Sequence, residues 1–174
     1  MTLYSRFIVL AVAATVALFS SSDAADPALK IRPVKAEVSG RGFEIRVLRK
    51  GAPAFKSRAY TWADLPEDID GLRYTQTQGG GTATIRLKAL ESGSVFVAVA
   101  ANQMLDMQEK GWNLPIPNRS NTFTYSDAAQ SLMMVLSHEV KQGEEIDIPQ
   151  VGWPGTIVLL PSDSKGKETK PLTL

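Results

Sequence analysis

Apolar and polar positions alternate strictly in several short segments of this 174-residue chain. In residues 42–48 the apolar side chains of Phe43, Ile45 and Val47 fall on one face, and charged side chains separate them. Because successive side chains of a strand point to opposite sides, this pattern predicts a strand with one buried face. Comparable patterns predict strands at 82–88, 132–140, 144–148 and 155–160, with shorter candidates at 35–38, 58–62, 72–76 and 122–125.

The segment 94–100 is apolar on both faces, with Val95, Val97 and Val99 on one side and Phe96 and alanines on the other. Such a segment is typical of a strand that is buried on both sides. Turn residues at 91–93 separate it from the preceding strand. We therefore expect residues 82–87 and 94–99 to pair as a hairpin.

Helical periodicity is scarce, and the best candidate is a helix of about two turns over 102–111 with Gly111 as its C-terminal cap. A glycine-rich stretch, 78–82, is expected to be a flexible connection. About eight to ten short strands with turn residues between them predict an all-β fold, a β-sandwich or jelly roll, with one short helix at most. We expect one domain over 25–161 and a flexible polar tail over 162–174.

The N-terminal residues have the pattern of an export signal. Arg6 precedes a mainly apolar run over 7–19, and small residues, Ser22 and Ala24, follow it. This order predicts a cleavable signal peptide over 1–24, forming a helix before cleavage, with Ala25 as the alternative cut. The run is shorter than the roughly 20 residues that cross a bilayer. The mature protein is therefore expected to be secreted or periplasmic, without a membrane anchor.

Composition narrows the classes of partner and chemistry. The chain has no cysteine, which excludes thiol catalysis and, beside an export signal, favours a bacterial protein. Its 19 basic and 18 acidic side chains nearly balance. A surface of this kind does not attract nucleic acid by charge, so no nucleic-acid partner is expected.

The sequence carries no established catalytic motif. His138 is the single histidine, and its neighbours Ser137 and Glu139 would point to the opposite face of a strand. One histidine without cysteines also makes a zinc site atypical. We therefore predict no catalytic residue, metal or cofactor. The remaining alternative is a cryptic polysaccharide hydrolase or lyase that uses carboxylates, for which Glu67, Asp68 and Asp70 are the candidates.

The three tryptophans, Trp62, Trp112 and Trp153, lie in loop-like contexts. An exposed indole can stack on the apolar face of a sugar, although tryptophans also seal the ends of β-sandwich cores. Trp112 is the preferred stacking residue, since amides and Arg119 follow it. The predicted ligand-binding residues are Trp112, Asn113, Arg119 and Trp153.

Several short motifs resemble a small β-sandwich module of secreted bacterial proteins, which is often appended to carbohydrate-active enzymes. They are Arg58-Ala-Tyr-Thr-Trp62, Leu65-Pro66, Gly71-Leu-Arg-Tyr74, the strand over 93–99, and Lys110-Gly-Trp112. The resemblance implies the fold more than an activity.

The leading hypothesis is an exported, non-catalytic β-sandwich that binds a glycan or cell-envelope polymer. The first alternative is a structural or assembly protein that contacts other envelope proteins. The second is the cryptic hydrolase or lyase.

Overall fold

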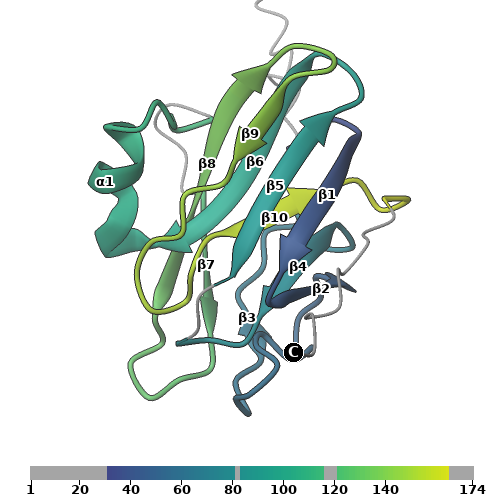
Figure 1. Cartoon of the computed structure of the whole chain (residues 1–174). Coiled ribbons are helices and arrows are strands. Elements are labelled where there is room, and N and C mark those ends of the chain that lie inside the picture. Colours follow the sequence, from purple (N-terminus) through teal and green to yellow (C-terminus); the bar gives the residue numbers. More distant parts are fainter. Residues whose placement is uncertain (1–30, 81–82, 116–120, 165–174) are drawn as a thin grey trace, which may run out of the picture.

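The computed structural model describes residues 31–80, 83–115 and 121–164 (Figure 1). The predicted signal peptide, most of the predicted tail and Arg119 lie outside the described residues. The elements in chain order are β1 (Ala36–Arg41), β2 (Phe43–Val47), β3 (Trp62–Ala63), β4 (Arg73–Thr77), β5 (Thr84–Ala89), β6 (Gly93–Ala100), the 3-10 helix η1 (Ala101–Gln103), α1 (Met104–Gln108), β7 (Thr122–Tyr125), β8 (Leu132–Val140), β9 (Glu145–Asp147) and β10 (Ile157–Leu160).

The strands form two antiparallel sheets. The small sheet has the order β1-β5-β9, and the large sheet has the order β2-β4-β10-β6-β8-β7-β3. Figure 1 shows the small sheet in front of the central strands of the large one, with α1 at the side. The predicted all-β class with one short helix is confirmed. Among the described residues, no helix is long and apolar enough to cross a membrane.

The space between the sheets is filled by an aliphatic core. Ile85 and Leu87 of β5 and the valines of β6 are buried in it, as the alternation predicts. Strand β5 alternates exposed and buried residues along its whole length, so its polar face is solvated. The core comprises chiefly Val34, Val38, Phe43, Ile85, Leu87, Val95, Val97, Val99, Met107, Trp112, Leu136, Val140, Ile148, Val158 and Leu160.

The opposite face of the large sheet carries a second core that is rich in aromatic rings. Phe96 and Ala98 of β6 belong to it, which confirms that β6 is buried on both sides. The irregular segment 48–72 supplies much of this core and is tied to itself by backbone hydrogen bonds, including Leu48 N–H to Leu72 O at 2.7 Å. The aromatic core comprises chiefly Leu48, Phe55, Trp62, Ile69, Tyr74, Phe96, Phe123, Tyr125, Met133, Val135, Ile157 and Leu159.

The predicted hairpin of β5 with β6 is wrong. Strand β5 pairs with β1 and β9, whereas β6 pairs with β10 and β8, so residues 90–92 carry the chain from the small sheet to the large one. The segment before β1 lies beside both ends of this crossing. Leu90 N–H donates to Lys35 O at 2.8 Å, and Val34 N–H donates to Ser94 O at 3.1 Å. The segment before β1 therefore satisfies Leu90 N–H and Ser94 O, which lie at the two ends of the crossing.

The predicted helix over 102–111 is present in a shorter form, as η1 followed by α1. Gly111 ends the turn in the left-handed region, with φ of 85°. Trp112 N–H donates to Met107 O at 3.1 Å, and Gly111 N–H donates to Gln108 O at 2.9 Å. These two bonds make a Schellman motif, which folds the residue after the glycine back over the last helical turn.

Candidate functional site

Trp153 is the large aromatic residue that reaches solvent at the edge of the aromatic core. It lies in the loop between β9 and β10, and 41% of it is exposed. The Phe55 ring meets the indole edge-on at 5.3 Å between centroids, and the rings of Tyr60 and Tyr125 lie at 6.3 and 6.5 Å. Phe55 and Tyr125 are buried, so the indole rests on a rigid aromatic base.

Two glycines allow the indole to lie close to the backbone. A Cβ atom at Gly79 would lie 3.0 Å from Trp153 Cη2, and one at Gly80 would lie 2.8 Å from its Nε1. Both glycines have positive φ, 70° and 73°, and Gly80 N–H donates to Trp153 O at 3.0 Å. Gly79 and Gly80, which belong to the connection predicted to be flexible, therefore position Trp153. Larger residues at these two places would displace the indole ring.

A hollow of about 350 Å³ opens beside the indole, and we call it the tryptophan hollow. The ends of β6 and η1 line one side, the ends of β7 and β8 line another, and the loop at Trp153 lines the third. Amides, hydroxyls and an exposed leucine face it, and none of its lining residues is charged. These residues are Ala100, Ala101, Asn102, Gln103, Tyr125, Ser131, Leu132, Gly152, Trp153 and Pro154.

Hydrogen bonds order the hydroxyl side of this hollow. Ser131 donates to both oxygens of Asp127, with its N–H and its hydroxyl each at 2.6 Å. Burial raises the pKa of the Tyr125 phenol above its ordinary value of 10.0, so the phenol stays protonated and can donate a hydrogen bond. Uncharged donors and acceptors next to an exposed indole suit a ligand that combines hydroxyl groups with one apolar face.

Arg58 adds a cation to the edge of this site. Its guanidinium carbon lies 5.8 Å from the centroid of the Trp153 ring, within the usual range of a cation–π contact. The side chain comes from the irregular segment that also supplies Phe55 and Tyr60. This one segment therefore places an aromatic base and a positive charge around the same indole.

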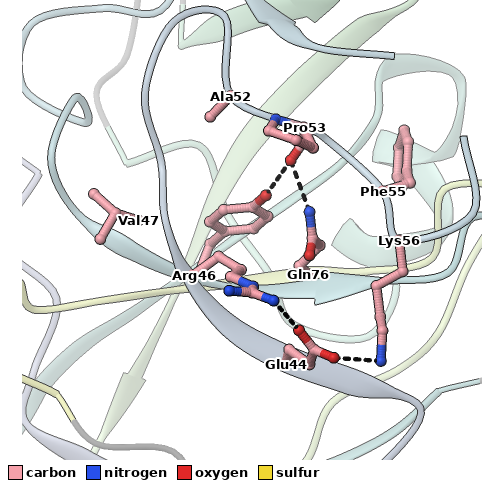
Figure 2. A pocket seen from close by; sticks show the side chains of 9 residues that line it. Glu44, Arg46, Val47, Ala52, Pro53, Phe55, Lys56 and Gln76 are labelled. Atoms are coloured by element: carbon pink, nitrogen blue, oxygen red, sulfur yellow. Dashed lines mark hydrogen bonds and ion pairs between the residues drawn. The ribbon is translucent and has the colours of Figure 1, made fainter. Parts of the chain in front are cut away.

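A second hollow, of about 460 Å³, lies over β2 and β4, and we call it the β2 hollow (Figure 2). Strand β2 contributes one side, β4 contributes the floor, and the irregular segment closes the other side. Its lining residues are Glu44, Arg46, Val47, Ala52, Pro53, Phe55, Lys56, Tyr74 and Gln76.

Charged and amide groups gather in the β2 hollow. Glu44 and Arg46 are two positions apart in β2 and so share a face, with Arg46 Nη2 2.5 Å from Glu44 Oε2. Lys56 Nζ lies 2.6 Å from the other carboxylate oxygen, and this hydrogen bond is the main reason that the pKa of Glu44 is lowered. The Tyr74 hydroxyl and Gln76 Nε2 both donate to Pro53 O at 2.7 Å, which holds the loop over the strands (Figure 2).

The expectation that Trp112 exposes its indole is wrong. Only 3% of Trp112 is exposed, and its ring packs in the aliphatic core, with its centroid 5.3 Å from that of His138. The Schellman motif explains this position, because it turns Trp112 back over buried Met107. Asn113 is exposed and bonds through its backbone to Ser137 of β8, and it lines neither hollow. Of the four predicted ligand-binding residues, Trp153 lines a hollow, and Arg119 is outside the described residues.

The candidate carboxylates do not form a site with either hollow. Glu67, Asp68 and Asp70 belong to the turn after Pro66 and line neither one. His138 has a packing role, with its Nδ1 3.0 Å from Gly111 O. Within the described ranges, no three His, Asp or Glu side chains group closely enough to hold a metal ion.

Sequence reasoning missed Phe55 and Gln76 as lining residues of the β2 hollow, and Arg58 as the cation over Trp153. Arg58 stands in the motif that resembles the β-sandwich module, and this motif was the available signal for it. Phe55 lies in a segment without periodicity. Gln76 lies in β4, whose consecutive buried polar residues give no alternation to interpret.

Comparison with known proteins gives a structural match. No family model and no curated protein matches the sequence. The fold is similar to part of a solved structure described as a "GH138 enzyme targeting pectin rhamnogalacturonan II", with a TM-score of 0.55 and 16% sequence identity. The match covers 80% of this chain and 18% of that chain. This chain therefore has a fold that also occurs within a much longer carbohydrate-active enzyme.

Proposed function

We propose that this protein is a non-catalytic glycan-binding protein that stacks a sugar ring on Trp153. The observation that carries the proposal is the exposed indole, held on buried aromatic rings beside a hollow lined by amides and hydroxyls. The face of an indole is electronegative and attracts the C–H groups of a pyranose, while amides and hydroxyls bond to its hydroxyls.

Three features of the site support a glycan over an apolar ligand. Asn102 and Gln103 offer both donors and acceptors, and Tyr125 and Ser131 offer hydroxyls. The large apolar side chains of the hollow are the indole and Leu132, which is 43% exposed. A sugar presents this combination of one apolar face and a hydroxylated rim.

The proposal includes export, because the N-terminal run over 7–19 has the pattern of a cleavable signal. Outside the inner membrane the protein would meet cell-envelope or environmental polysaccharides. The similarity to part of a carbohydrate-active enzyme supports a role close to such polymers, as an assisting or targeting protein.

Binding to a glycan array followed by calorimetry tests the proposal. The Trp153→Ala variant is expected to lose affinity about five-fold, since an aromatic stacking contact contributes about 1 kcal/mol. The Trp153→Tyr variant, which keeps a ring, should retain most of the affinity. Equal unfolding midpoints in urea would show that both variants are folded.

Wild-type affinity in a folded Trp153→Ala variant would refute the stacking role. Absence of binding to every glycan on the array would refute the function itself.

A further inference from the structure

We propose that the β2 hollow is a second subsite, which binds the carboxylate of an acidic sugar, so that the glycan bound at Trp153 is a uronate-containing polymer. This inference rests on the proposed glycan-binding function and names its ligand class. It is carried by the side chains that Figure 2 shows in the hollow, together with their position relative to Trp153.

The charges in the β2 hollow favour an anion. Two cations, Arg46 and Lys56, face a single carboxylate, Glu44, so the three side chains carry one net positive charge. The ion pair with Glu44 engages one terminal nitrogen of Arg46, whose side chain is 60% exposed. A guanidinium has five N–H donors in a planar fork, so donors remain for a second carboxylate.

An amide in the β2 hollow indicates that the anion also carries hydroxyl groups. Gln76 is 5% exposed and lines the hollow, and its Nε2 donates to Pro53 O. The same side-chain amide carries an oxygen, which is a hydrogen-bond acceptor. A sugar hydroxyl can donate to this oxygen, whereas a bare inorganic anion has no donor to offer.

The two hollows are close enough for one oligosaccharide to contact both. Phe55 lines the β2 hollow, and its ring lies 5.3 Å from that of Trp153. Gln76 in the β2 hollow and Gly79 under the indole are three residues apart, which separates their Cα atoms by at most about 11 Å. Arg58 stands over the indole and adds a positive charge there. A polymer with repeated carboxylates would therefore meet a cation at each subsite.

Calorimetry with an oligogalacturonate and its fully methyl-esterified form tests this inference, since the two probes share a backbone and differ in charge. Wild type should bind the acid form about ten-fold more tightly in low salt, and salt should reduce this preference. The Arg46→Gln variant should reduce the preference several-fold without changing affinity for the ester, because Lys56 and Arg58 remain. The Glu44→Gln variant should strengthen binding of the acid form, because the competing carboxylate is gone.

The Lys88→Gln variant is the matched control, because Lys88 is exposed on the small sheet and its loss changes the net charge equally. It should bind both probes as wild type does. Equal affinity of wild type for the acid and the ester, or an unchanged preference in Arg46→Gln, would overturn the acidic subsite. That result would leave Trp153 stacking intact if Trp153→Ala still weakened both probes. Absence of binding to either probe would overturn the subsite, and the glycan array would then decide the general function.

Discussion

The two faces of β6 are packed in different ways. Val95, Val97 and Val99 meet the aliphatic side chains of a regular three-stranded sheet, whereas Phe96 and Ala98 meet aromatic rings from an irregular segment. A regular sheet covers its face with pleated backbone whose own hydrogen bonds are satisfied. The irregular segment over 48–72 lines one side of the β2 hollow, and its Phe55 supports Trp153 at the tryptophan hollow, so both hollows form at the edge of the aromatic core that it helps to build.

This difference separates stability from recognition. The aliphatic core stabilises the fold through area burial, and swaps of similar volume are tolerated there. The aromatic core also fixes the orientation of rings that extend to Trp153 at the surface. A change in the second core should therefore affect both folding and binding, and a change in the first should affect folding alone.

The largest expected effect is that of Trp62→Ala in the aromatic core. Trp62 is 1% exposed, and its ring lies 5.2 Å from that of Phe123 and 5.6 Å from that of Tyr74. Its loss should lower the free energy of unfolding by about 4 kcal/mol in urea titrations and reduce the near-ultraviolet dichroism. Glycan affinity should also fall, because Phe55 and Tyr125 lose the ring that they pack against. A loss of stability below about 1 kcal/mol would contradict this description of the aromatic core.

A smaller effect is expected for Leu87→Ala in the aliphatic core. Leu87 is 1% exposed and lies in register with Val38 of β1 and Ile146 of β9. The substitution should cost about 3 kcal/mol by the same measurement. Glycan affinity of the folded variant should equal that of wild type. If folded Leu87→Ala bound the glycan more weakly than wild type, the two cores would be coupled. Stability and recognition would then not be separated between them.

The smallest effect is expected for Glu44→Gln, which removes the ion pairs of the β2 hollow. The side chains are partly exposed, so the loss at neutral pH should be about 0.5 kcal/mol or less. Because the pKa of Glu44 is lowered in the folded state, its contribution is present above the ordinary value of 4.5 and is lost as pH falls through the folded value. Unfolding midpoints of wild type and variant should therefore converge in acid. If the unfolding midpoints of wild type and Glu44→Gln still differ at low pH, packing and not the ion pairs causes the difference in stability.

Alternation along the chain was sufficient to predict most strands, but not their partners. The pattern in β5 and β6 shows which side chains are buried. The same side chains would be buried if the two strands paired in one sheet or if they faced each other across a core. The short turn between them favoured a hairpin. In the structure, the segment before β1 bonds to both sides of the crossing between β5 and β6, and no pattern in the sequence indicates this contact.

The two Gly-Trp dipeptides show the same limit for the candidate site. Gly111 and Gly152 both adopt positive φ, 85° and 64°, and each precedes a tryptophan. Trp112 follows a helix, so a Schellman motif returns it to the core, whereas Trp153 follows a short strand and an open loop. The dipeptide alone does not distinguish the two. Only the preceding element does: the sequence predicted the helix and its glycine cap, but the cap alone does not show that a buried Met107 lies where the chain returns.

The two ends of the large sheet bear on self-association. One end is β3, which is two residues long, and the other is β2, whose Glu44 forms ion pairs with Arg46 and Lys56. Long, flat, apolar edge strands act as templates for fibril growth, and short or charged ones do not. The apolar faces of the large sheet therefore end at edges that offer little for another chain to extend, so growth of a fibril from this sheet is disfavoured.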